Sequence, residues 1–107
     1  MPLPVASLDS ATAAEGAILF RALADPIRLR LLSIIASATT ELCVCDLSGD
    51  FEVSAPTISH HLKVLREAGL VEFNRRSTWV YYRTVPERLQ RISALLPAPS
   101  PAAAAIR

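Results

Sequence analysis

The two cysteines of the chain, Cys43 and Cys45, lie two residues apart and are the side chains most capable of specific chemistry. Thiolates are soft ligands, so a close pair suits a soft, thiophilic ion. Two other interpretations stay open: small buried hydrophobes, or a redox switch whose disulfide between residues i and i+2 would be strained. Two thiols are too few for a tetrahedral structural zinc site. We therefore treat Cys43 and Cys45 as candidate ligands.

The histidines do not complete such a site. His60 and His61 are the only two in the chain, and adjacent side chains on a helix diverge, so they cannot readily share one metal ion. His61 falls near the apolar side of its helix, and we expect it to be a packing residue. His60 falls on the outer side, where we expect it to contact DNA rather than a metal.

Two helices are expected around these residues, the first from about Val44 to Phe51 and the second after Ser54. Ser54 is a good N-cap, Pro56 fits the first helical turn, and Gly69 suits the position just past the helix end. Ile58, Leu62 and Leu65 form the buried stripe. A short helix, a turn and a capped second helix make a helix-turn-helix, in which the second helix reads DNA.

The outer face of the second helix has the chemistry of a DNA contact. Short hydroxyls, an imidazole and an ammonium group suit phosphates and base edges, and they come from Pro56, Ser59, His60 and Lys63, with Thr57 at the flank. The alternative is an ordinary solvated helix face.

The position of the thiols also predicts a mechanism. Residues i and i+2 of a regular helix lie on different sides, so one ion holds both sulfurs only if the helix start distorts. We expect ligand binding to unwind that start and lower DNA affinity indirectly.

Two strands are expected after Gly69, at Leu70–Asn74 and Trp79–Val85, because both runs are rich in β-branched and aromatic residues. Strands directly after a recognition helix make a wing. Arg75 and Arg76 would lie at its tip, facing a phosphate backbone or a minor groove. The tip has no glycine, so its turn type cannot be named from the sequence.

The remaining elements are helices that build the core and a second interface. One is expected over about Leu8 to Leu23, one from Pro26 after the N-cap Asp25, and one from Pro86. The first and last carry apolar stripes that one small core does not cover. We therefore expect a homodimer through these two helices, matched to a palindromic operator with half-sites about 34 Å apart.

Composition fits one domain of mainly α class, with about five helices and a two-stranded wing. Of 107 residues, 51% are hydrophobic and 20% charged. Residues 8–96 form the predicted winged helix-turn-helix domain, residues 1–7 a flexible tail, and residues 97–107 a disordered Pro/Ala tail. No apolar run spans a membrane and no signal peptide is visible, so we expect a cytoplasmic protein.

Charge is distributed unevenly along the chain, although its net value is only +1. Residues 1–53 hold three basic and seven acidic side chains, a formal charge of −4. Residues 54–91 hold seven basic and three acidic side chains, a charge of +4. An excess of arginine and lysine in one half is a usual feature of a phosphate-facing surface, whereas an ordinary mixed surface is the alternative.

From about Phe20 through Leu96, the chain resembles the ArsR/SmtB family of winged-helix repressors. The similar segments are ALADPIRLRLL (22–32), ELCVCDL (41–47), VSAPTISHHLKVLREAGLV (53–71) and WVYYR (79–83), and ELCVCDL is typical of the arsenic-responsive branch. The resemblance implies a DNA-bound apo dimer, no enzymatic activity, and release when trivalent arsenic or antimony binds cysteine thiolates. It makes Cys43 and Cys45 the metalloid ligands. The DNA contacts it implies are Ser54, Pro56, Thr57, Ser59, His60 and Lys63 on the helix, with Arg75 and Arg76 on the wing.

One departure from that branch concerns the third ligand. The best-known motif reads CVCDLC, whereas this chain has Ser48 at the last position and no other cysteine. Inorganic arsenite can take three thiolates, so water or another oxygen, such as that of Ser48, would complete its site here. A methylated trivalent arsenical has two positions for sulfur, which two cysteines satisfy, so methylarsenite is an alternative inducer. Thiol redox sensing and a small thiol enzyme or metal carrier are the competing functions.

Overall fold

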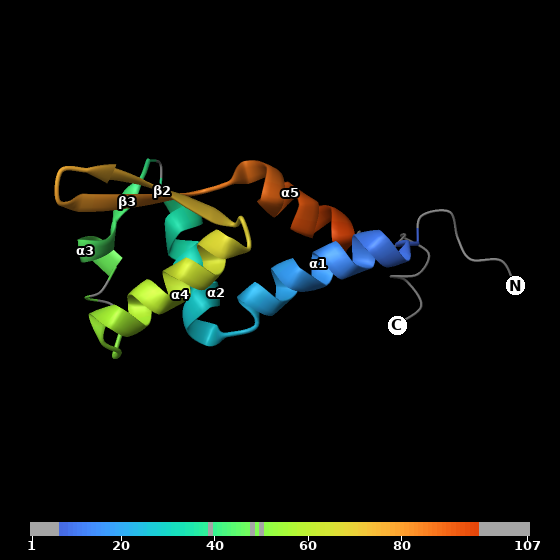
Figure 1. Cartoon of the computed structure of the whole chain (residues 1–107), viewed down its shortest axis with the longest axis horizontal. Coiled ribbons are helices and arrows are strands. Elements are labelled where there is room, and N and C mark those ends of the chain that lie inside the picture. Colours follow the sequence, from blue (N-terminus) through green and yellow to red (C-terminus); the bar gives the residue numbers. More distant parts are fainter. Residues whose placement is uncertain (1–6, 39, 48, 50, 97–107) are drawn as a thin grey trace, which may run out of the picture.

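The computed structural model describes residues 7–38, 40–47, 49 and 51–96. The two expected tails, apart from Ser7, and Ser48 lie outside the described residues. The elements in order are α1 Ser10–Leu23, α2 Pro26–Ser37, β1 Leu42–Cys43, α3 Val44–Leu47, α4 Ala55–Glu67, β2 Val71–Arg76, β3 Trp79–Thr84 and α5 Pro86–Leu95 (Figure 1). The expected mainly α fold with five helices is confirmed. None of the helices in the described ranges is long and apolar enough to cross a membrane.

Helix boundaries follow the capping residues that the sequence predicts. The Asp25 carboxylate accepts hydrogen bonds from the backbone N–H groups of Ile27 and Arg28, at 2.8 and 3.1 Å, and so caps α2. Ser54 caps α4 in the same way. Gly69 follows the end of α4 with a φ of 80°, a conformation that L side chains rarely adopt. These caps fix where α4 begins and ends.

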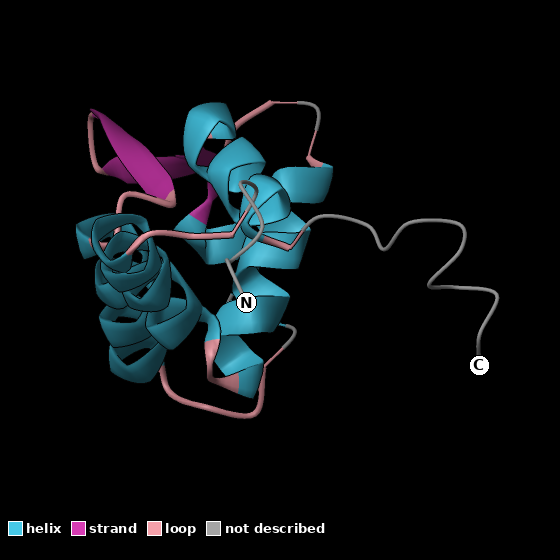
Figure 2. Ribbon diagram, turned by 90° about the vertical axis from the view of Figure 1, so that its right-hand side faces the viewer, coloured by secondary structure: helices cyan, strands magenta, loops and turns pink. Residues whose placement is uncertain are grey.

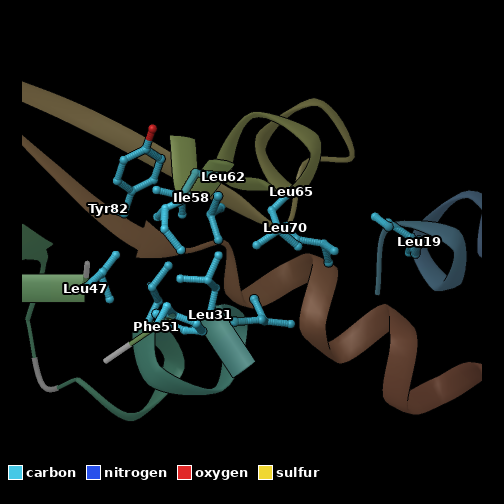
Figure 3. Packing of buried hydrophobic residues seen from close by; sticks show 13 residues of the cluster. Leu19, Leu31, Leu47, Phe51, Ile58, Leu62, Leu65, Leu70 and Tyr82 are labelled. Carbon is cyan, nitrogen blue, oxygen red and sulfur yellow. The ribbon is translucent and has the colours of Figure 1, made fainter. Parts of the chain in front are cut away.

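The core lies between α2, α4 and the sheet, and Figure 3 shows its side chains packed against one another. Leu31 of α2 and the expected α4 stripe of Ile58, Leu62 and Leu65 have no solvent-exposed surface. Leu47 and Phe51 are also buried, as predicted, so the chain after α3 is anchored at both residues. Burying a leucine or isoleucine side chain contributes roughly 1.5–3 kcal/mol, so this stripe fixes α4 firmly on the domain.

The expected two-stranded wing is formed by β2 and β3, and a third short strand, β1, which the sequence did not predict, extends the sheet. Its order is β1-β3-β2, and both pairings are antiparallel. In β1, Leu42 pairs with Tyr82 and Cys43 with Tyr81. A strand of two residues is too short to show alternation in the sequence, which is why it was missed. Figure 2 shows the strands at one side of a cluster of helices.

The wing turn is shorter than expected, so two arginines lie in a strand instead of in the turn. Arg76 pairs with Trp79, which leaves a two-residue loop of Ser77 and Thr78. Ser77 has a φ of 59° and Thr78 is not in the positive-φ region, an arrangement compatible with a type II′ turn. Arg75 and Arg76 are therefore the last residues of β2, and the prediction that they form the tip was wrong.

The helix expected over Val44–Phe51 is also shorter in the structure. The α3 helix spans only Val44–Leu47, and Cys43 belongs to β1 rather than to a helix start. Gly49 follows closely, and glycine costs about 1 kcal/mol relative to alanine within a helix. The two cysteines therefore lie across a junction between a strand and a helix.

The first and last helices lie side by side at the end of the molecule away from the wing (Figure 1). Their contact is close at Gly16, where an added Cβ would come within 2.7 Å of Leu95 Cδ1. Arg91 of α5 and Glu15 of α1 add an exposed ion pair at 3.5 Å. Side-chain packing therefore holds the two helices together, because an exposed ion pair contributes little.

Candidate functional site

The two thiols converge at the junction between β1 and α3. The Cys45 thiol donates a hydrogen bond to the Cys43 sulfur, with 2.6 Å between the two Sγ atoms, and neither cysteine is in a disulfide. Cys43 is 6% exposed, whereas Cys45 is exposed. The expectation that the backbone must distort to bring the sulfurs together was wrong. It assumed a regular helix at both positions, and the change from strand to helix removes that restriction.

The surroundings of Cys45 favour its protonated form. The hydrogen bond to Cys43 is the largest cause that raises the pKa of the Cys45 thiol, followed by partial burial and the nearby Asp46 carboxylate. The Asp46 Oδ1 atom lies 4.0 Å from the Cys45 sulfur. The Cys45 thiol is therefore suited to a reaction in which a ligand replaces its proton, rather than to holding a permanent thiolate.

Both sulfurs line a groove of about 340 Å³ between α3, α4 and the wing. Its walls include Ser59 and Arg66 of α4 and the wing residues Phe73, Arg75 and Trp79. Of these, the sequence singled out only Ser59 and Arg75. The groove residues Arg66, Phe73 and Trp79 were missed as site residues, although a tryptophan beside a solvent-exposed turn was an available signal. A ligand at the thiols would lie against both α4 and the wing.

A third protein ligand is not evident at this site. Within the described ranges, no group of three or more histidine, cysteine, aspartate or glutamate side chains is placed to hold a metal ion. The expected oxygen from Ser48 lies outside those ranges. The arrangement therefore provides two sulfur ligands and an adjoining groove.

The outer face of α4 carries the predicted polar side chains. Pro56, Ser59, His60 and Lys63 are exposed, and Thr57 is half-buried. Lys63 forms an exposed ion pair with Glu67, with 3.8 Å between Nζ and Oε1. Such a pair contributes at most about 1 kcal/mol, so the ammonium group remains available to a phosphate.

Ser54 and Thr57 have a structural role at the start of the same helix. The Ser54 hydroxyl accepts a hydrogen bond from the Thr57 backbone N–H at 3.4 Å, and the two hydroxyl oxygens lie 2.9 Å apart. Ser54 therefore orients the N-terminal turn of α4, where backbone N–H groups attract anions.

His61 is a packing residue, as predicted. It is half-buried, and its Nδ1 lies 3.2 Å from a guanidinium nitrogen of Arg28. Arginine has no acceptor atom, so this contact makes Nδ1 the acceptor. The Arg28 Nε–H group also donates to the backbone carbonyl of Ala22 at 2.6 Å. These bonds connect α4 to Arg28 of α2 and, through Arg28, to the last turn of α1.

The two wing arginines differ in their surroundings. Arg75 is exposed and lines the groove. Arg76 forms an ion pair with Glu41, with 2.5 Å between Nη2 and Oε1, and its guanidinium carbon lies 4.9 Å from the centre of the Tyr81 ring. Glu41 directly precedes β1, so this ion pair joins the wing to the segment that carries Cys43.

At the opposite end, α1 and α5 present an apolar surface. A groove of about 480 Å³ is lined mostly by small and apolar side chains, including Leu8, Phe20, Leu95 and Leu96. Phe20 and Leu96 are among the large hydrophobic side chains that remain exposed. Contiguous exposed apolar surface of this kind usually marks a site of association.

Comparison with known proteins identifies the family. A profile described as "Bacterial regulatory protein, arsR family" matches residues 25–72. The chain is 48% identical over 79 residues to an arsenic resistance transcriptional regulator of Pseudomonas putida, a match covering 74% of this chain and 61% of that protein. The match thus spans less than two thirds of that relative's length.

Solved structures agree with this result. An ArsR-like transcriptional regulator from Rhodococcus sp. superimposes with a TM-score of 0.67 at 30% identity, covering 78% of this chain and 76% of that one. HlyU from Vibrio cholerae gives a TM-score of 0.70 at 31% identity, covering 81% and 94%. The fold is therefore the winged helix of these regulators, and the chain belongs to the ArsR family.

Proposed function

We propose that this protein is a transcriptional repressor that binds operator DNA as a homodimer and is released when trivalent arsenic or antimony binds Cys43 and Cys45. The observation that carries the proposal is the convergence of the two sulfurs, 2.6 Å apart, in a groove walled by the recognition helix and the wing. The arsenic resistance regulator of Pseudomonas putida, with 48% identity over the matched segment, supports the choice of metalloid.

In this proposal, α4 reads the major groove and the wing contacts the backbone beside it. Ser59, His60 and Lys63 contact bases and phosphates from the exposed face of α4, and Pro56 and Thr57 lie at its N-terminal turn. Ser54 acts through the cap, and its backbone lies beside the N–H groups that attract a phosphate. Arg75 contacts a phosphate directly, whereas Arg76 must first give up part of its contact with Glu41.

The apolar surface of α1 and α5 supports the homodimer. A second copy of the chain would cover Phe20 and Leu96, which water otherwise contacts. A two-fold axis through these helices presents two α4 helices to the same side of the dimer, which suits a palindromic operator.

Metalloid binding is a condensation without a redox step. Each thiol gives its proton to a hydroxyl group on arsenic, that hydroxyl leaves as water, and an As–S bond replaces the As–O bond. Two thiols replace two hydroxyls, and arsenic stays trivalent. The third substituent is hydroxyl in arsenite and methyl in methylarsenite, so this donor set fits both inducers.

Release follows because the ligand joins two elements that position the DNA-reading surfaces. Cys43 pairs with Tyr81 of the wing strand β3, and Cys45 belongs to α3, directly before the recognition helix. Bound arsenic would fix the distance between these elements, and its third substituent would face the groove that Ser59 and Arg75 also line. The ligand thereby favours a conformation of low DNA affinity.

Fluorescence anisotropy on the DNA upstream of the gene tests the proposal. Arsenite, methylarsenite, antimonite, cadmium and hydrogen peroxide are titrated against the complex in parallel. The trivalent metalloids should release wild-type protein from the DNA. Cys43→Ser or Cys45→Ser should abolish that release. Thr78→Ala is the matched control, because Thr78 lines the same groove but carries no thiol.

The outcomes separate the competing functions. If no metalloid weakens DNA binding, the repressor function would be supported and the metalloid-sensing function would be contradicted. Release by peroxide alone, reversed by dithiothreitol, would establish the redox alternative instead. Release by metalloids from the two serine variants would show that the thiol pair is not the sensor.

A further inference from the structure

The groove beside the thiols exposes aromatic surface that the core does not use. Trp79 is 52% exposed and Phe73 is 39% exposed, and both line the groove together with Cys43 and Cys45. Large aromatic side chains bury much of their surface in most domains and dominate the energetics of binding sites. Aromatic walls next to two convergent thiols therefore point to a ligand with both a thiophilic and an apolar part.

The number of ligands leads to the same conclusion. Two thiols occupy two of the three positions of trivalent arsenic, and no third histidine, cysteine or carboxylate completes a cluster within the described ranges. Because both cysteines line the groove, a third substituent on that arsenic would have the groove as its surroundings. At about 340 Å³ the groove reaches the lower limit of volumes typical of small-molecule sites, which is larger than a hydroxyl or methyl group needs.

The lining favours a flat ring over an alkyl chain. The Arg66 guanidinium lies 5.0 Å from the centre of the Phe73 ring, so one face of Phe73 is already covered by a cation. The ring of Trp79 is then the more available stacking surface. Arg66 and Arg75 add cations that can lie against a π face. A ring in this groove would make stacking and cation–π contacts that methyl cannot make.

We propose that this groove binds the ring of aryl-substituted trivalent arsenicals and makes the sensor selective for them over methylarsenite and arsenite. This inference rests on the proposed function, since it requires arsenic on Cys43 and Cys45. The arylarsonous acid loses two hydroxyl groups as water, taking one proton from each thiol, and its carbon–arsenic bond stays intact. The ring then stacks on Trp79.

Binding of phenylarsonous acid and methylarsonous acid to the intact, DNA-free protein tests the inference. Calorimetric titration gives both affinities, each divided by the affinity of the same arsenical for dithiothreitol, which removes their intrinsic difference toward thiols. Quenching of Trp79, the only tryptophan of the chain, reports ring contact independently. We expect a normalised preference for the phenyl compound of roughly three- to tenfold.

Trp79→Ala should remove most of that preference while leaving methylarsonous acid binding unchanged, and Trp79→Phe should restore part of it. Leu29→Ala is the control, because Leu29 is also exposed but lies on α2, away from the groove. Equal normalised affinities of wild type for the two arsenicals would overturn this inference but not the proposed function. The same holds if Trp79→Ala lowers the affinity for both arsenicals equally. Failure of both arsenicals to bind wild type would overturn the proposed function as well.

Discussion

The recognition helix and the thiol segment are neighbours in the chain but are held by different means. Thirteen residues of α4 carry a side-chain cap and three side chains with almost no exposed surface. The thiol segment has a strand of two residues followed by a helix of four. The first is stable enough to present side chains to DNA unchanged. The second consists of these two short elements, so we expect a bound ligand to reshape it more easily.

Leu62→Ala should have the largest effect among the changes that test this contrast. Leu62 has no exposed surface, so its truncation leaves a cavity and should cost about 2–5 kcal/mol of unfolding free energy. Urea denaturation measures the change. Val44→Ala, at the half-buried first residue of α3, should lower the unfolding free energy by less than Leu62→Ala. A larger loss of unfolding free energy for Val44→Ala than for Leu62→Ala would contradict the view that α4 is held more firmly than the thiol segment.

Hydrogen exchange should separate the two segments in the unmodified protein. Amides of α3 should exchange through local opening, whereas amides of α4 between Ile58 and Leu65 should require opening close to global unfolding. We expect protection factors at least about tenfold lower in α3, equivalent to about 1.4 kcal/mol. Mass spectrometry of peptides covering Leu42–Leu47 and Ile58–Leu65 measures this. Equal protection would mean that the thiol segment is as rigid as the recognition helix.

Ser54→Ala should destabilise the protein by about 1 kcal/mol, because it removes the hydroxyl that caps α4. Thermal denaturation with DNA affinity measured in parallel checks the result. Ser59→Ala is the matched control, because it is the same substitution on the exposed face of the same helix. It should leave stability within about 0.5 kcal/mol and weaken DNA binding. A stability loss for Ser59→Ala equal to that of Ser54→Ala would contradict the assigned roles.

The smallest expected effect concerns the ionisation of Cys45. Hydrogen bonding to Cys43 raises the pKa of the Cys45 thiol, which lowers its thiolate fraction at any pH below that pKa. Cys43→Ala removes the largest cause, so the pKa should fall and iodoacetamide should alkylate Cys45 faster at pH 8. Cys43→Ser keeps an acceptor and should change the rate less. Slower alkylation in Cys43→Ala would show that Cys43 activates Cys45 instead.

The contrast between the two segments also explains what could be predicted from the sequence. The start of α4 at Ser54 and its end before Gly69 were predictable, because capping chemistry and a period of 3.6 residues act locally. The strand at Leu42–Cys43 was not, because a two-residue strand exists only through its pairing with β3. The convergence of the sulfurs depends on that pairing, so it was unpredictable for the same reason.

The wing shows a similar division. Its strands were predicted from β-branched and aromatic content, but the two-residue turn depends on Ser77 adopting a positive φ without a glycine. The ion pair of Arg76 with Glu41 connects residues 35 positions apart, and no local pattern reveals it. Local sequence patterns therefore predict α4 and the two wing strands, whereas β1 and the groove arise from contacts between distant segments.

The close contact of Gly16 with Leu95 has a consequence for how the domain can be modified. It holds the middle of α1 against the end of α5, on the side away from the thiol groove and the wing (Figure 1). Gly16→Ala would require the Leu95 side chain to shift. That adjustment would lie at the end of the domain opposite the thiol groove, so the packing of α1 on α5 can be altered separately from the groove.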